Sequence, residues 1–238
     1  MNIVITAGGT SEYIDSVRKI TNSGTGKLGS LIANKLSNGN TIFYICSKKA
    51  VKPVILPGMD IRTIEISTTM DLKEAVEDIL KNYQIDWFIH SMAVSDYIVD
   101  YVSTSDMIAK FLDEKGLSAQ NIESNTNILN NKEKISSDKE NLIICLKKAP
   151  KIIGIIKKLS PETHLIGFKL LSSVSKDELI RVANNLKEKN KCDYVVANDL
   201  EDIKKGNHKA LIIGDDIVSV EGKENIANYI ENIISKIY

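Results

Sequence analysis

Cysteine, histidine and proline are scarce in this chain of 238 residues, which contains three, three and four of them respectively. The cysteines, Cys46, Cys145 and Cys192, have no CxxC or metal-ligand spacing, which argues against a zinc site and a disulfide framework. The net charge is zero, so no overall attraction draws the chain to nucleic acid or to an anionic membrane. No run approaches the roughly 18 apolar residues that span a bilayer, and no secretory leader pattern opens the chain. We therefore expect a cytoplasmic protein without a nucleic-acid or membrane partner.

Short apolar runs alternate along the chain with amphipathic stretches of helical period. The runs expected as strands are Ile3–Thr6, Thr41–Cys46, Trp87–Ser91, Leu142–Leu146, His164–Phe168, Tyr194–Ala197, Ala210–Ile213 and Ile217–Val220. The stretches expected as helices are Lys27–Leu36, Met70–Tyr83, Pro150–Lys158, Lys176–Lys189 and Lys223–Ile237. This alternation predicts a doubly wound α/β fold with a mostly parallel sheet and helices on both faces. A short Gly-Asp-Asp link between the last two strands predicts an antiparallel hairpin at the sheet edge.

One segment, residues 97–141, breaks the alternation. It is polar, rich in Ser, Asn, Asp and Lys, and has only weak helical periodicity near its start. Long irregular insertions in α/β domains are commonly functional flaps, interface elements or disordered segments. We therefore expect residues 1–238 to form a single nucleotide-binding domain with an irregular flap or insertion at about 97–141.

Two glycine-rich segments are candidate phosphate sites. Gly8 and Gly9 follow the first strand, where glycines let backbone N–H groups approach an anion; an ordinary tight turn is the alternative. The segment Gly24-Thr-Gly26-Lys27-Leu-Gly29 opens a helix, whose N-terminus attracts phosphate. Its GxGxxG spacing lies too far from the first strand for a dinucleotide site, and no acidic residue ends the second strand. The segment therefore predicts a mononucleotide cradle, with close helix packing as the alternative.

Polar residues near these segments and at strand ends are further candidates. Arg18 and Asn22 lie between the two glycine segments, and the fork of an arginine suits phosphate. Asp96 follows one apolar strand and Asn198 another, where carboxylates and amides bind ligands or cap turns. His90 lies inside an apolar run, which favours a buried, hydrogen-bonded histidine over a catalytic base.

Six motifs together, in order along nearly the whole chain, resemble phosphopantothenate–cysteine ligase, in its single-function bacterial form. They are Gly-Gly-Thr, Asp-x-Val-Arg-x-Ile-Thr-Asn, Gly-Lys-Leu-Gly, Ala-Val-Ser-Asp-Tyr, Gly-Phe-Lys and Ala-Asn-Asp. The resemblance implies a Rossmann-like fold, a homodimer, and CTP with Mg²⁺ as the activating nucleotide. It also implies that 4′-phosphopantothenate forms an acyl-cytidylate, which L-cysteine then attacks to release CMP.

The resemblance also implies roles for particular residues. Asn22 and Lys134 are the expected catalytic residues. Substrate is expected to contact Arg18, Asn22, Ala93 and Asp96, with Arg18 reaching from the neighbouring subunit. Nucleotide is expected to contact Gly8, Gly9, Gly24, Gly26, Lys27, Gly29, Asp96, Lys134, Pro150, Ile152, Ile153, Phe168 and Asn198. No metal ligands are assigned.

The chain departs from the family pattern in two places near the nucleotide. Two serines follow Lys134 and Ile135 where bacterial fusion forms carry lysines. Lys187, Lys189 and Lys191 lie near the family's two nucleotide-binding lysines but out of register with them. An ATP-using ligase therefore remains an alternative. An NAD(P)-dependent oxidoreductase and a non-catalytic nucleotide sensor are the alternatives outside the ligase class.

Overall fold

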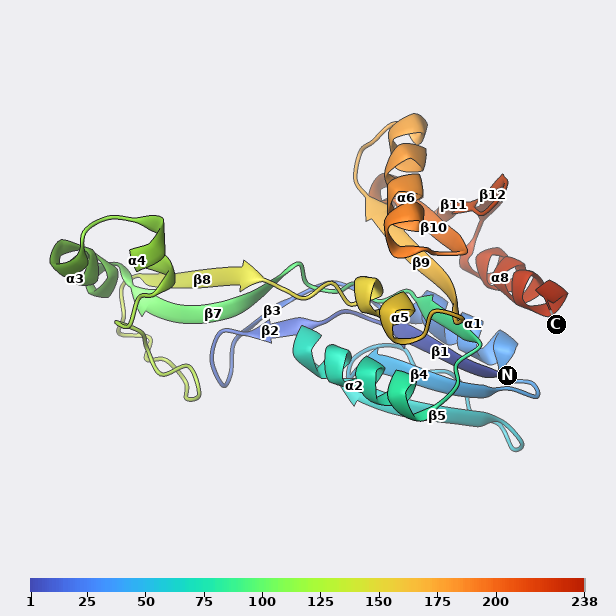
Figure 1. Cartoon of the computed structure of the whole chain (residues 1–238), viewed down its shortest axis with the longest axis horizontal. Helices are drawn as coiled ribbons and strands as arrows, with labels where there is room; N and C mark the ends of the chain where they lie inside the picture. The colour runs from blue at the N-terminus through green and yellow to red at the C-terminus, as the bar shows by residue number, and fades with distance from the viewer. Residues whose placement is uncertain (238) are drawn as a thin grey trace.

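A central sheet of eight strands organises the computed structural model, which describes residues 1–237 (Figure 1). The strand order is β12-β11-β10-β9-β6-β1-β4-β5. From β10 to β5 every neighbouring pair is parallel, whereas β11 pairs antiparallel with both β10 and β12. The strands are β1 (Asn2–Ala7), β4 (Thr41–Ser47), β5 (Asp60–Ile66), β6 (Trp87–His90), β9 (His164–Leu171), β10 (Tyr194–Asp199), β11 (Lys209–Ile213) and β12 (Ile217–Glu221). The predicted fold class and its antiparallel edge hairpin are confirmed.

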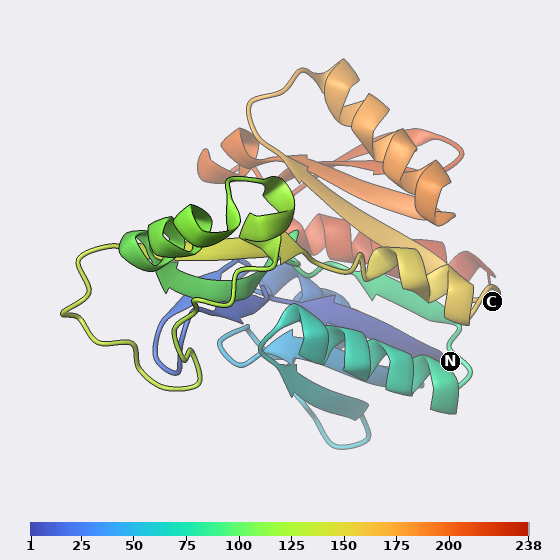
Figure 2. The same ribbon diagram turned by 60° about the vertical axis from the view of Figure 1, so that its left-hand side comes forward.

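Helices cover both faces of this sheet (Figure 2). One face packs against α1 (Lys27–Leu36) and α8 (Lys223–Ile237). The other packs against α2 (Thr69–Asn82), α5 (Ile153–Leu159) and α6 (Lys176–Asn190). Side chains of β1 alternate between the two resulting cores, as the period of a strand requires. Within residues 1–237, no helix is both long and apolar enough to cross a membrane.

The sequence did not predict edge strand β5, and it placed the start of α5 too early. Three of the seven side chains of β5 are exposed and only Ile66 is buried, so the apolar run that marks an inner strand is missing. Helix α5 begins at Ile153 rather than at Pro150, because Ile152 is its N-cap and the preceding residues form the connection from β8.

The segment expected to be irregular belongs to an arm, residues 97–148, that projects from the sheet and combines regular elements with an irregular stretch at 124–141 (Figure 1). Strands β7 (Tyr97–Thr104) and β8 (Leu142–Lys148) pair antiparallel, and α3 (Ser105–Lys115) and α4 (Ala119–Glu123) lie beyond them. The predicted strand Leu142–Leu146 therefore exists but belongs to this ribbon. Because most side chains of the arm are exposed, the sequence outside Leu142–Leu146 lacks the apolar periodicity by which its elements could be recognised.

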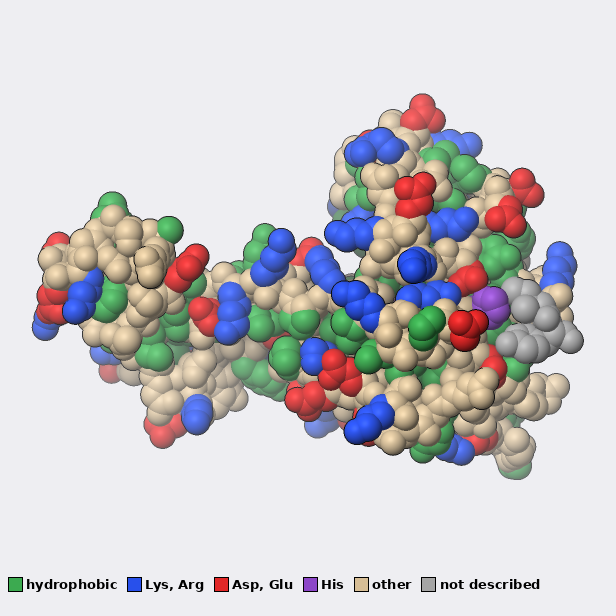
Figure 3. Space-filling model, in the orientation of Figure 1, with side chains coloured by type: hydrophobic (Ala, Val, Ile, Leu, Met, Phe, Trp, Pro, Cys, Tyr) green, Lys and Arg blue, Asp and Glu red, His purple; other side chains and the backbone are tan. Residues whose placement is uncertain are grey.

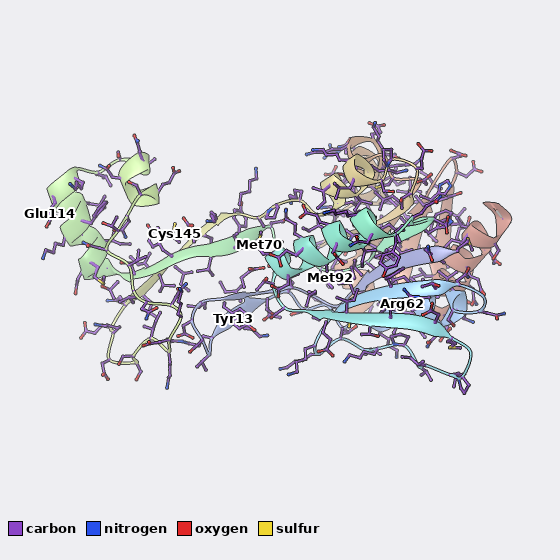
Figure 4. The ribbon with its side chains drawn as sticks, turned by 60° about the horizontal axis from the view of Figure 1, so that its bottom comes forward. Tyr13, Arg62, Met70, Met92, Glu114 and Cys145 are labelled. Atoms are coloured by element: carbon purple, nitrogen blue, oxygen red, sulfur yellow. The ribbon has the colours of Figure 1, made fainter. Side chains whose placement is uncertain are left out.

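A short hairpin, β2 (Ser11–Tyr13) and β3 (Lys19–Thr21), lies between the sheet and the arm (Figure 4). It follows directly from the loop after β1, and β2 contacts β7. Ser11 N donates to the Ser67 carbonyl over 2.8 Å, which fixes the hairpin to the start of α2. The hairpin therefore connects the first glycine segment to the arm.

The core between α8 and the sheet yields a stability prediction. Ile230 is fully buried among side chains of α1, α8 and β1, whereas Ile217 on β12 is 47% exposed. We expect Ile230→Ala to lower the free energy of unfolding by roughly 2–5 kcal/mol, because it removes buried methyl groups and leaves a cavity. Ile217→Ala should cost much less, and urea denaturation of both variants makes the comparison. Equal losses would contradict the assigned packing.

Candidate active site

A cavity of about 520 Å³ opens at the carboxyl ends of β1, β6, β9 and β10. This is the edge at which open parallel sheets bind ligands. Twelve of the residues expected at the site line it: Gly8, Gly24, Gly26, Lys27, Gly29, Ala93, Asp96, Pro150, Ile152, Ile153, Phe168 and Asn198. Residues from distant parts of the chain thus converge on one cavity, as the strand-end argument predicts.

The two glycine segments pack directly against each other. A Cβ added to Gly24 would collide with the Gly8 carbonyl oxygen, and one added to Gly9 would collide with the carbonyl oxygen of Asn22. Gly8 also accepts a 2.9 Å hydrogen bond from Ala93 N, so the β6 loop joins the same contact. At Gly9 the packing explanation is sufficient, because Gly9 does not line the cavity.

The start of α1 has the features expected of a phosphate cradle. Its N-cap, Gly26, adopts a left-handed conformation (φ 73°) and supplies no side chain to cap the helix. No acidic residue occupies the first turn. Gly29 lets the helix approach β1, since a Cβ there would lie 2.7 Å from the Cβ of Ala7. The first backbone N–H groups of α1 therefore face the cavity without a competing carboxylate.

Asn22 lies just behind the cavity wall and is held by a hydrogen-bond chain. Its Nδ2 donates to Ser95 Oγ over 2.7 Å, and Ser95 lines the cavity. The backbone N of Ser95 donates to Thr10 Oγ1 over 2.9 Å. Thr10 Oγ1 in turn accepts from Thr69 Oγ1 at 3.2 Å. This chain orients the carboxamide of Asn22 toward the cavity edge occupied by Ser95.

His90 is part of the cavity floor, and the prediction that it is buried and hydrogen-bonded is confirmed. Its Nδ1 lies 2.9 Å from Thr6 Oγ1. Burial lowers the pKa of His90 to about 4. The ring is therefore neutral at pH 7 and does not supply a positive charge there.

Lysines dominate the charge of the cavity lining. Lys27, Lys151, Lys169 and Lys223 line it, and Asp96 is the one acidic side chain that does so within the described part of the chain. Asp96 is exposed and pairs with Lys151 at the rim. Figure 3 shows lysine and arginine side chains gathered between α5 and α6. A polyanion is the ligand that such a lining favours.

Sequence reasoning did not identify Lys151, Lys169, Lys223 or His208 as site residues. Lys169 belongs to the quoted Gly-Phe-Lys motif and directly follows the expected strand His164–Phe168, so its position was available as a signal. Lys223 and His208 flank the edge hairpin, and only the antiparallel return of that hairpin brings them to the cavity.

Asn198 and Asp199 have different roles despite being adjacent. Asn198 lines the cavity, and its Nδ2 donates to the Lys209 carbonyl over 2.8 Å. Asp199 caps the helix α7 (Leu200–Lys204) by accepting from Glu201 N at 2.8 Å. The cap explanation therefore holds for Asp199.

Arg18 and Lys134 lie outside the cavity lining, at the root of the arm. Arg18 donates from Nε to Asp15 Oδ2 over 2.9 Å and from Nη2 to the Ile135 carbonyl over 2.9 Å. Lys134 is exposed. Hydrogen bonds from the side chain and backbone of Arg18 hold the pKa of Asp15 well below its usual range, so Asp15 stays ionised.

The three lysines considered for the nucleotide do not line the cavity. Lys187 donates to the Gly214 carbonyl over 2.8 Å, while Lys189 and Lys191 are exposed. Leu186, one residue earlier on α6, does line it.

No metal cluster of three or more His, Cys, Asp or Glu side chains occurs in residues 1–237. Asp96, the one carboxylate of the cavity lining in these residues, is paired with Lys151.

Comparison with known proteins agrees with this fold. Coenzyme A biosynthesis bifunctional protein CoaBC of Thermococcus kodakarensis is 31% identical over 215 residues, which make up 90% of this chain and 45% of that protein. The crystal structure of the DNA/pantothenate metabolism flavoprotein from Streptococcus pneumoniae is 38% identical, with both chains fully covered and a TM-score of 0.86. A Cab2 mutant in complex with phosphopantothenate-cysteine shares the fold at 15% identity, with 97% of this chain and 86% of that one covered and a TM-score of 0.68.

The chain spans less than half the length of the curated relatives it matches, at 45% of the Thermococcus protein and 40% of the one from Methanocaldococcus jannaschii. A family model described as the DNA/pantothenate metabolism flavoprotein C-terminal domain matches residues 1–131 and 127–237. The resemblance carried by the motifs is thereby confirmed at the level of this domain family. The chain belongs to the family of the DNA/pantothenate metabolism flavoprotein C-terminal domain.

Proposed function

We propose that this chain is a phosphopantothenate–cysteine ligase of coenzyme A biosynthesis that uses CTP. The observation that carries the proposal is the lysine-lined cavity at the start of α1, which has the volume and charge for a nucleotide beside a second phosphorylated substrate. Its curated relatives include bifunctional coenzyme A biosynthesis proteins, and a protein of the same fold has been crystallised with phosphopantothenate-cysteine.

The proposed reaction has two steps. A carboxylate oxygen of 4′-phosphopantothenate attacks the α-phosphorus of CTP, and the bond to pyrophosphate breaks. The amine of L-cysteine then attacks the acyl carbon, loses a proton, and CMP leaves with the electrons of the acyl–oxygen bond. Mg²⁺, bound with CTP near Asp96, would neutralise phosphate charge. Both steps require orientation and charge stabilisation more than covalent catalysis by the protein.

The residues of the cavity and its wall suit these two requirements, orientation and charge stabilisation. In the proposed mechanism, backbone N–H groups at the start of α1 and the Lys27 ammonium hold phosphate oxygens, which the cavity lining there supports. The amide of Asn22, hydrogen-bonded to Ser95 of the lining, orients the acyl group at the cavity edge. The neutral His90 and the apolar lining from Met92 and Phe168 limit water at the acyl-nucleotide.

The oxidoreductase alternative is disfavoured by the end of β4. A dinucleotide fold needs a carboxylate there for the ribose, but β4 ends at Ser47, whose Oγ accepts from Gly9 N at 3.3 Å. A Cβ on Gly8 would collide with the same hydroxyl. The space beside Gly8 is therefore filled by protein.

A homodimer would complete the site. Arg18 and Lys134 lie outside their own subunit's cavity, although the family resemblance assigns both to substrate or nucleotide phosphate. The hairpin and the arm carry exposed apolar side chains that a second copy could cover, namely Tyr13, Val17, Ile20, Tyr97, Ile143 and Leu146. In the proposed dimer, the hairpin of each subunit would bring Arg18, and the loop of its arm Lys134, to the partner's cavity.

Pyrophosphate release tests the reaction and its nucleotide. With 4′-phosphopantothenate, L-cysteine, Mg²⁺ and CTP, the wild type should release pyrophosphate and form phosphopantothenoylcysteine. Release with ATP in preference to CTP would select the ATP-using ligase. CTP binding without release under any of these conditions would select the nucleotide sensor and overturn the proposal.

Asn22→Ala should lower kcat about 100-fold while the melting temperature stays close to that of the wild type, because the lost amide stabilises the reacting centre. Asn38→Ala, an exposed asparagine on the loop after α1, is the matched control and should retain full turnover. Unaltered product formation by Asn22→Ala would remove Asn22 from the mechanism.

Lys134→Ala should slow nucleotidyl transfer about tenfold, since one charge near the departing pyrophosphate is lost, and should weaken CTP binding less. Single-turnover kinetics separates the two effects. Lys132→Ala removes an exposed lysine from the same loop and serves as the control. A defect confined to binding would reject the catalytic role of Lys134.

Mixed dimers test the shared site. The Arg18→Ala and Asn22→Ala proteins should each be nearly inactive. An equal mixture with random subunit exchange should recover about a quarter of wild-type activity. The reason is that half of its dimers then contain one intact site of two. Light scattering after size exclusion verifies the dimer. Complete exchange without recovery would show that Arg18 acts within its own subunit, and a monomer would reject the dimer itself.

A further inference from the structure

One end of the cavity lies where two helices begin side by side. Helices α1 and α8 pack on the same face of the sheet, through Ile32 of α1 and Ile226 and Ile230 of α8. Their first residues, Lys27 and Lys223, both line the cavity. The positive ends of two helix dipoles and two ammonium groups therefore converge on the same space.

His208 completes this group from a third element. It lies just before β11 and lines the same cavity. Its backbone is left-handed, with φ of 43°, and its carbonyl accepts from Gly222 N at 3.1 Å. A non-glycine residue in this conformation carries a backbone cost that persists where surrounding structure fixes it, commonly at functional sites. The turn thus holds the imidazole beside the starts of both helices.

These three cationic groups act on one another, and Glu224, the acidic residue in the first turn of α8, is exposed and does not line the cavity beside them. Burial, followed by the charges of Lys223 and Lys27, lowers the pKa of His208. Burial and the charge of Lys27 also lower the pKa of Lys223. Within residues 1–237, none of the three forms an ion pair.

The neighbouring helix α7 does not contribute a carboxylate to the main cavity either. Its Leu200 and Ile203 side chains line the cavity beside His208. Its acidic residues, Glu201 and Asp202, line a separate cavity of about 280 Å³. An anion entering the main cavity at this end therefore meets positive or apolar groups.

We propose that Lys27, His208 and Lys223 together bind one phosphate group of a substrate, with His208 donating a hydrogen bond from a ring nitrogen. This subsite deepens the proposed function, because the ligase reaction supplies two sources of phosphate. One is the triphosphate of the nucleotide, and the other is the phosphomonoester of phosphopantothenate. Both present the same oxyanion chemistry to the three side chains.

Proton uptake follows from the same geometry. In the free protein the lowered pKa leaves His208 mostly neutral at pH 7. A bound phosphate favours the imidazolium and raises this pKa, so a proton is taken up on binding. The contribution of His208 is present at low pH and is lost as pH rises through the pKa of the bound state.

The subsite is tested by calorimetric titration with inorganic pyrophosphate, CTP and 4′-phosphopantothenate. Each titration is run in two buffers of different ionisation enthalpy, which measures the proton uptake. His208→Asn preserves the left-handed backbone, which asparagine tolerates, and removes the titrating ring. Both His208→Asn and Lys223→Gln should weaken binding of one natural ligand about tenfold, and His208→Asn should abolish its proton uptake. Lys209→Gln, which removes a charge from the exposed side chain next to His208, is the control and should bind as the wild type does.

The pattern of losses identifies the source of the phosphate. A loss confined to CTP and pyrophosphate assigns the subsite to the triphosphate, and a loss confined to 4′-phosphopantothenate assigns it to the phosphomonoester. Normal affinity and proton uptake in folded His208→Asn and Lys223→Gln would overturn the subsite, even if the wild type is an active ligase. Losses in both variants with a wild type that releases no pyrophosphate would keep the subsite and reject the ligase.

Discussion

Direct backbone contact between the two glycine segments is the constraint on which the site depends. Gly24 lies against the Gly8 carbonyl and Gly9 against the Asn22 carbonyl, so neither contact has room for a Cβ. This contact sets the distance between the end of β1 and the start of α1. It also carries Asn22 to Ser95 on the β6 loop, 2.7 Å away. Gly9 and Gly24 therefore act first by allowing this close packing. The accessibility of the N–H groups at the start of α1 is a consequence of that packing.

Charge is unevenly distributed between the cavity and the rest of the chain, and the net charge does not show this. The whole chain is neutral, yet the cavity lining has four lysines and a single carboxylate. Asp96 already pairs with Lys151, so the positive charge left inside belongs to Lys27, Lys169 and Lys223. Unpaired like charges in a partly buried space oppose one another, and an anionic ligand relieves that cost. The cavity is therefore built to be most stable when an anion is bound.

The sequence predicted the sheet, its covering helices and the glycine loops, because buried strands and helix starts leave local signals. Edge strand β5 has a single buried residue and most side chains of the arm are exposed, so apart from Leu142–Leu146 neither left such a signal. The cations of the cavity show a different limit. His208 and Lys223 are 15 positions apart across a hairpin, and they meet Lys27 only because α1 and α8 share one face of the sheet. Such a cluster depends on topology, which no local pattern contains.

The carboxylate of Asp15 joins the segment that contains Arg18 to the loop that contains Lys134. Asp15 accepts from Arg18 Nε at 2.9 Å and from Ile135 N at 3.2 Å, so it joins the hairpin to the arm loop that carries Lys134. Because its pKa is held well below the usual range, this link stays charged throughout the physiological pH range. Arg18 and the backbone next to Lys134 are consequently held together. In a dimer, whichever cavity receives Arg18 would receive Lys134 with it, and the two would act on the same bound ligands.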